Sequence, residues 1–141
     1  MKNPIDIQNL ADLRIREAVK LQKSKFYDGA FYLAGYAVEL YLKAKICDTM
    51  DVPDFYDTHV PKSDLSKTFL IHNLDRLMLL SGLHTKFEAA KKTVPNLTDH
   101  WDKVLTWSEK SRYNNPNTKT EIEALEFIES SKIIIKWIKK H

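Results

Sequence analysis

A chain of 141 residues, with 43% hydrophobic and 29% charged side chains, is long enough for one hydrophobic core and too short for two ordinary ones. We therefore expect a single folded domain over residues 1–141. The three glycines, at positions 29, 35 and 82, do not have the spacing of a P-loop or Rossmann phosphate loop. The net charge of +3 permits contact with a nucleic acid but does not argue for one.

The first predicted helix begins at Asn3 and Pro4. Asparagine is a favoured N-cap, and proline is favoured at the first helical position. The apolar residues that follow recur at helical spacing: Ile7, Leu10, Ala11, Ile15, Ala18 and Leu21. A polar joint at residues 24–29 ends this helix.

Residues 30–47 form the most apolar segment and predict a central helix. Their only charges are Glu39, Lys43 and Lys45. A helix that is apolar around most of its circumference must be covered on most sides, so we expect it also to form a dimer interface. Three small residues allow another helix to approach closely: Ala34, Gly35 and Ala37.

The middle of the chain begins with a polar break. Residues 48–67 contain five aspartates and two prolines, and we expect a loop with a short helical turn near Phe55. A helix is predicted from about Thr68 to a stop at Gly82. Its inward residues are expected to be Phe69, Leu70, Leu74, Leu77 and Met78.

Three threonines predict the starts of the remaining helices: Thr85 in a capping box with Glu88, Thr98, and Thr120 in a box with Glu123. The first of these helices ends before Pro95, the second runs out near Arg112 and Tyr113, and the third follows a break at residues 114–117. The last helix places five residues inward: Ile122, Leu125, Ile128, Ile134 and Ile138. The sequence therefore predicts an all-α fold.

Two polar features of the helices have alternative interpretations. Glu39 and Lys43 lie one turn apart, and they form either an exposed ion pair worth about 0.3 kcal/mol or a polar pair that faces a cleft. Because a charge in an apolar helix is costly unless it is paired or hydrated, the pair should mark the edge of this helix that solvent or a ligand reaches. His72 is likewise either structural or part of a site.

The segment 107–113, Trp-Ser-Glu-Lys-Ser-Arg-Tyr, places an arginine and a tyrosine where a helix gives way to a loop. In one interpretation Trp107 belongs to the core, Arg112 ends the helix and Tyr113 packs on the loop. In the other, Arg112 offers a planar fork to a phosphate and Tyr113 stacks on a ligand or bonds to it through its hydroxyl.

Metal, disulfide and membrane signals are weak. The single Cys47 lies in an apolar stretch and is expected to be buried. The five histidines lack metal-ligand spacing, and the aspartate-rich loop lacks the glycine and glutamate of an EF-hand, so we predict no metal and no cofactor. With no secretory leader and no apolar run that spans a bilayer, we expect a cytoplasmic protein without membrane contact.

Three segments in order carry a family resemblance: residues 30–47, the stretch 72–77 that begins His-Asn-Leu, and Ser111-Arg112-Tyr113 after a tryptophan-bearing helix. They resemble the HEPN family (higher eukaryotes and prokaryotes nucleotide-binding domain) over roughly residues 5–140. The resemblance implies an up-and-down bundle of four to five main helices, usually a homodimer, with a polar groove for RNA, nucleotides or a partner protein. Many members are metal-independent ribonucleases of toxin–antitoxin or defence systems, and others accompany a minimal nucleotidyltransferase.

The ribonuclease members place a histidine after an arginine, with four to six residues between them. From Arg112 these positions hold Asn117, Thr118 and Lys119. The imidazole that would accept the 2′-hydroxyl proton near neutral pH is therefore absent, and enzymatic activity stays an open question.

Three hypotheses about function follow. The first is a non-catalytic HEPN domain that dimerises and binds a nucleotide, RNA or a nucleotidyltransferase through a groove formed by Glu39, Lys43, His72, Arg112 and Tyr113. The second is a ribonuclease toxin in which His72 or His100 replaces the missing imidazole. The third is a purely structural interaction module that uses the apolar surface of the second helix.

Overall fold

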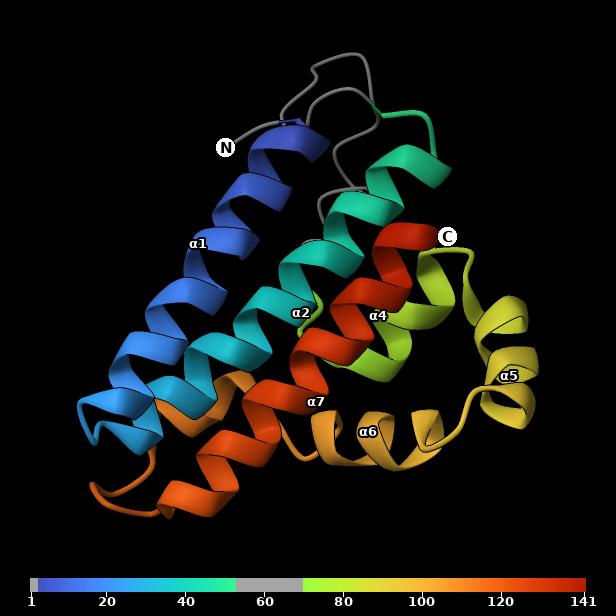
Figure 1. Ribbon diagram of the computed structural model, residues 1–141. Helices are drawn as coiled ribbons and strands as arrows, with labels where there is room; N and C mark the ends of the chain where they lie inside the picture. Colours follow the sequence, from blue (N-terminus) through green and yellow to red (C-terminus); the bar gives the residue numbers. More distant parts are fainter. Residues whose placement is uncertain (1–2, 53–69) are drawn as a thin grey trace.

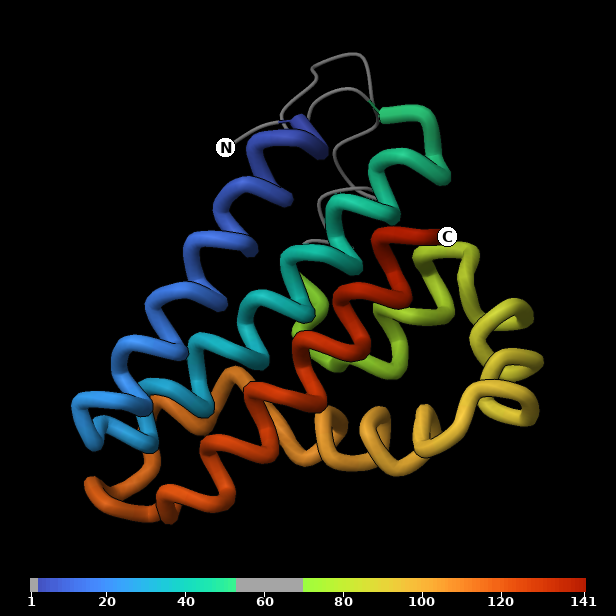
Figure 2. Tube along the Cα trace, viewed as in Figure 1, coloured from blue at the N-terminus to red at the C-terminus, as the bar shows by residue number. Residues whose placement is uncertain are grey.

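Three long helices form the body of the molecule. The computed structural model describes residues 3–52 and 70–141, and within them all regular structure is helical, as predicted. The long helices are α1 (Pro4–Lys23), α2 (Tyr27–Thr49) and α7 (Glu121–Lys140). Figure 1 shows α2 between the other two, and Figure 2 shows that α1 runs antiparallel to α2 while α7 runs in the same direction as α2.

Short elements lead the described chain back to the start of α7. They are α4 (Leu74–Leu80), α5 (His84–Thr93), α6 (Leu97–Val104) and a 3-10 helix, η1 (Glu109–Tyr113). α4 lies behind α7 in Figure 1, α5 lies at the edge of the bundle, and α6 crosses near the lower half of α7. Both α4 and η1 contact α2.

α2 is buried on nearly every side, as its apolar sequence predicts. Ala34, Val38, Leu42 and Ala44 have no exposed surface, and Cys47 is also buried. The core around them includes large side chains from the other helices: Ile7, Leu77, Met78, Phe87, Trp101, Phe127 and Ile134. Because a single chain covers these residues, their burial does not require a partner, and a dimer through α2 stays a prediction.

Two of the predicted helix caps are confirmed. Asn3 Oδ1 accepts the Asp6 N–H at 2.8 Å, and Thr120 Oγ1 accepts the Glu123 N–H at 3.2 Å. Gly82 follows α4 with a φ of 79°, a left-handed conformation that favours glycine. Helix caps and a glycine stop depend only on residues that are close in the sequence, so they can be predicted from the sequence alone.

The third predicted helix begins later than expected. It starts at Leu74 rather than near Thr68, because Asn73 caps it by accepting the Arg76 N–H at 2.9 Å. Leu70 was expected to face inward and is 74% exposed. The predictions for residues 55 and 69 lie outside the described residues.

The predicted start of α2 and the boundaries of α5 and α6 also need correction. α2 begins at Tyr27 rather than residue 30, and α5 and α6 each begin one residue before the predicted threonine cap, so Thr85 and Thr98 lie inside the first turns. α6 ends at Val104 instead of running to Arg112. The chain leaves the helix there because Trp107 packs against α2.

In the first turns of α7, the buried face is not the one that the sequence predicted. Ile122 and Leu125 are 68% and 49% exposed, because Ala124 and Phe127 occupy the buried positions instead. The other three predicted residues, Ile128, Ile134 and Ile138, are buried. The spacing of 124, 127, 128 and 131 is as helical as the predicted one, so only the fold distinguishes the two faces.

Candidate functional site

A buried carboxylate in the middle of α2 joins two polar side chains. Glu39 is 2% exposed, and its Oε1 accepts a hydrogen bond from Lys43 Nζ at 2.7 Å. His72 Nδ1 lies 2.9 Å from the same oxygen. Glu39 Oε2 has no hydrogen-bond partner among the described residues. Since Lys43 is only 7% exposed, the interpretation as an exposed ion pair is wrong.

Two tyrosines extend this polar face of α2 towards its start. Tyr32, Tyr36, Glu39 and Lys43 are spaced by four, three and four residues, which places them on one side of the helix. The two tyrosine rings stack with centroids 6.2 Å apart. Burial, and then the negative charge of Glu39, raises the pKa of Tyr36. The face therefore runs from the buried carboxylate to the part of α2 near η1.

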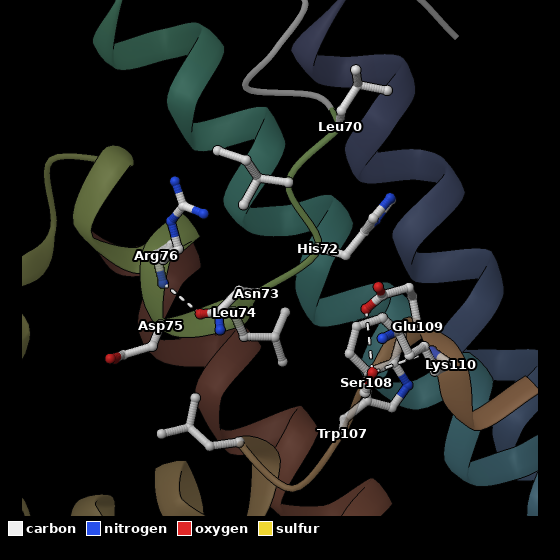
Figure 3. A pocket seen from close by; sticks show the side chains of 12 residues that line it. Leu70, His72, Asn73, Leu74, Asp75, Arg76, Trp107, Ser108, Glu109 and Lys110 are labelled. Atoms are coloured by element: carbon white, nitrogen blue, oxygen red, sulfur yellow. Dashed lines mark hydrogen bonds between the residues drawn. The ribbon is translucent and has the colours of Figure 1, made fainter.

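A pocket of about 570 Å³ opens beside this face (Figure 3). One wall is formed by residues 70–76, where the chain enters α4, and the other by Leu105 and residues 107–110, where it enters η1. The His72 side chain belongs to the first wall and is 39% exposed. Because its Nδ1 contacts Glu39, His72 connects the pocket to the buried charges of α2.

Trp107 fixes the second wall against α2. A Cβ atom added at Gly35 would lie 2.1 Å from Trp107 Cδ1, so the indole occupies the space that a side chain would need. The indole N–H donates to the Tyr32 carbonyl oxygen at 3.0 Å, and the two rings stack with centroids 6.1 Å apart. The small residues of α2 were expected to receive another helix, and at Gly35 they receive an aromatic ring instead.

η1 presents Arg112 and Tyr113 at the surface. The turn is capped by Ser108 Oγ, which accepts the Lys110 N–H at 3.2 Å. The Arg112 guanidinium lies 4.9 Å from the centroid of the Tyr113 ring, and Tyr113 is 75% exposed. Side-chain hydrogen bonding with Tyr32, and then the contacts with Tyr113, raises the pKa of Arg112 above its ordinary value. Its positive charge is therefore permanent.

The five predicted site residues fall into two groups on the same side of α2. Glu39, Lys43 and His72 contact one another, whereas Arg112 and Tyr113 lie on η1. Tyr32, which neighbours Arg112, is separated from Glu39 by seven positions, or about 10 Å along a helix. Among these five residues His72 alone lines the pocket, and Arg112 follows the second wall by two residues.

Sequence reasoning missed four residues of this region: Tyr32, Tyr36, Arg76 and Lys110. The tyrosines share the helical spacing of Glu39 and Lys43, and that periodicity would have identified them. Arg76 and Lys110 give no such signal, because exposed basic residues occur on most helices and only the fold brings these two to one pocket.

Asp28, in the first turn of α2, holds the loop that follows η1. Its Oδ2 accepts the backbone N–H groups of Asn117 and Thr118 at 2.6 and 3.2 Å, and its Oδ1 accepts that of Lys119 at 2.7 Å. These are the positions at which the HEPN resemblance would place a histidine after Arg112. In this chain their backbone is used to fasten the loop to α2.

The variant Asp28→Ala is expected to lower the free energy of unfolding by about 2 kcal/mol, because three backbone N–H groups lose a charged acceptor. Urea denaturation followed by circular dichroism measures the change. The matched control is Asp102→Ala at an exposed position of α6, where we expect little effect. Equal stability of the two variants would contradict the role of Asp28.

The remaining histidine of interest, His100, lies outside the pocket lining. Its Nδ1 is 2.8 Å from Ser130 Oγ on α7. The described part of the chain contains no group of three or more His, Cys, Asp or Glu side chains arranged to hold a metal ion. None of the helices seen in residues 3–52 and 70–141 is both long and apolar enough to cross a bilayer.

Comparison with known protein families identifies the family of the chain. The family model described as HEPN domain matches residues 9–141, nearly the whole chain. The match includes all of α2, the pocket and η1. None of the curated proteins and none of the solved structures matches the chain.

Proposed function

Because the chain belongs to the HEPN domain family, whose domains are nucleotide- and RNA-related, we propose that it is a non-catalytic domain that binds a nucleotide or single-stranded RNA. One observation carries the proposal: on one side of α2, a pocket lined by His72 opens beside a turn that exposes Arg112 and Tyr113. A phosphate of the ligand contacts Arg112, a base stacks near Tyr113, and the pocket receives the adjoining part of the ligand.

The chemistry of these side chains supports this proposal. A guanidinium group is always charged and offers N–H donors in a planar fork, so Arg112 can hold two phosphate oxygens at once. Tyr113 exposes most of its ring, and nucleic-acid bases stack on such aromatic faces. Lys110 and Arg76 also line the pocket, each next to an acidic residue, Glu109 and Asp75.

We expect Arg112→Ala to weaken the binding of AMP or a short RNA about tenfold or more, since it removes a bidentate phosphate contact. Isothermal titration calorimetry at low salt measures the affinity. Arg16→Ala, at an exposed position of α1, removes the same charge outside the site and serves as the control. If the two variants bind equally well, Arg112 is not the phosphate contact.

A second candidate is a metal-independent ribonuclease toxin, which the contact between Glu39 and His72 favours. A carboxylate that fixes one ring nitrogen of a histidine orients the other nitrogen for proton transfer. The absence of histidine at positions 117–119 favours binding without cleavage.

Expression of the chain in a bacterial host distinguishes the two candidates. We expect growth to continue, because no histidine follows Arg112 at the ribonuclease spacing. Growth arrest that His72→Ala and Arg112→Ala both abolish would replace the binding proposal by the ribonuclease. His84→Ala, at an exposed position in α5, controls for the loss of any histidine.

Dimerisation and a nucleotidyltransferase partner also stay predictions of the family resemblance. A purely structural module that uses the apolar surface of α2 is disfavoured, because the chain itself covers that surface. A dimer would therefore use the exposed parts of α2 together with other elements, and sedimentation equilibrium measures whether it forms.

A further inference from the structure

The formal charges in the described walls of the pocket cancel apart from one histidine. Asp75 and Arg76 stand together in the first wall, and Glu109 and Lys110 stand together in the second. Each set contributes one negative and one positive charge. The remaining titratable group in these walls is His72, whose ring is directed away from the turn at residues 109 and 110 in Figure 3.

The neighbouring charges behind the walls cancel in the same way. Glu39 and Lys43 form a buried pair at 2.7 Å, and on α1 Arg14 bonds to Glu17 at 2.7 Å. Tyr36 stays protonated at neutral pH, because burial raises its pKa. Apart from Arg112, which is positively charged and follows the second wall by two residues, this described set of groups carries a net charge of zero when His72 is neutral and of about +1 when it is protonated.

The contact with Glu39 also determines what His72 offers a ligand. A carboxylate oxygen accepts, so the ring nitrogen 2.9 Å away, Nδ1, carries a hydrogen. In the neutral ring Nε2 is then an acceptor, which repels a phosphate oxygen. In the imidazolium ring Nε2 becomes a charged donor. The Glu39 carboxylate, which contacts Nδ1, stabilises that positive charge.

We propose that His72 is a proton-dependent anion contact of this pocket, which binds the phosphodiester or phosphate group of the ligand as an imidazolium. The inference rests on the proposed function and adds a chemical condition to it: when the anion enters, the complex takes up a proton on His72 Nε2. Because the bound state holds the additional proton, affinity rises as pH falls, by up to about tenfold per pH unit while the free ring is neutral.

The test uses 2′-O-methylated ApA, a dinucleotide whose phosphodiester does not titrate near neutral pH and which cannot be cleaved through a 2′-hydroxyl. Calorimetric titration near pH 7.5, in PIPES and in Tris, separates the binding heat from the heat of buffer ionisation. Uptake of a substantial fraction of one proton per ligand is expected for the wild type, and none for His72→Gln. The control His84→Gln, at an exposed position of α5, should take up as many protons as the wild type.

The outcomes distinguish this inference from the binding proposal itself. Binding heats that are the same in both buffers, or proton uptake that persists in His72→Gln, would overturn the role of His72 and leave Arg112 in place. A wild-type protein that binds no dinucleotide at about pH 6 or pH 7.5 would overturn both. Affinity that rises on acidification in the wild type and stays constant in His72→Gln would support the inference.

Discussion

Replacement of Gly35 by alanine is expected to lower the free energy of unfolding by about 3 kcal/mol, although alanine is favoured over glycine by about 1 kcal/mol in an ordinary helix. The new methyl group would lie 2.1 Å from Cδ1 and 2.2 Å from Cγ of Trp107. The indole is rigid and 5% exposed, so it would have to move away from α2. That movement breaks the hydrogen bond to the Tyr32 carbonyl oxygen and opens a gap in the core.

Urea denaturation followed by tryptophan fluorescence measures the loss, and α2 supplies its own control. At Gly29 an added Cβ would meet only the flexible end of Leu21, at 3.3 Å, so Gly29→Ala should cost no more than about 0.5 kcal/mol, and the helix preference for alanine would offset that cost by up to about 1 kcal/mol. Adding Trp107→Leu to Gly35→Ala should recover part of the lost stability, because a smaller side chain leaves room for the methyl group. Equal stability of Gly35→Ala and Gly29→Ala would show that the indole does not occupy this position.

The long helices were predictable because their signals are local. Asn3 and Thr120 cap the helices that follow them, and the apolar character of α2 required burial whatever covered it. The short elements were not predictable to the same degree. Thr85 and Thr98 have the side chains of caps but lie within first turns. The loop before α5 is held to α2 by the hydrogen bond that Thr49 donates to the Ser81 carbonyl oxygen, and α6 packs on α7, so tertiary contacts rather than the nearest threonine set where these helices begin.

The sequence identified individual residues of the candidate site, but it did not predict which of them contact one another. Glu39 and His72 are 33 positions apart, and nothing in the sequence indicates that one oxygen of Glu39 contacts both His72 and Lys43. Arg112 was expected at the end of a long helix, whereas it lies on η1 because Trp107 packs on Gly35 and redirects the chain. A glycine in an apolar helix indicates close approach, but it does not identify the group that approaches.

The variant Glu39→Met is expected to lower the free energy of unfolding by about 3 kcal/mol, because it removes the carboxylate that compensates the buried charge of Lys43. Methionine has a similar volume, so the loss of charge, rather than a cavity, dominates the effect. The exposed pair of Lys103 and Glu126, at 2.9 Å, provides the comparison. Glu126→Met should cost no more than about 0.5 kcal/mol, because water solvates both partners of that pair.

A double-mutant cycle isolates the contribution of the pair from that of either side chain alone. Adding Lys43→Met to Glu39→Met removes the ammonium group that has lost its bond to Glu39, so the double variant should be more stable than Glu39→Met, with a coupling energy of about 2 kcal/mol. Urea denaturation of the four proteins gives the coupling directly. Additive losses would mean that Glu39 and Lys43 do not depend on each other. His72 would then lose the fixed, compensated carboxylate on which its proton-dependent contact with a phosphate is based.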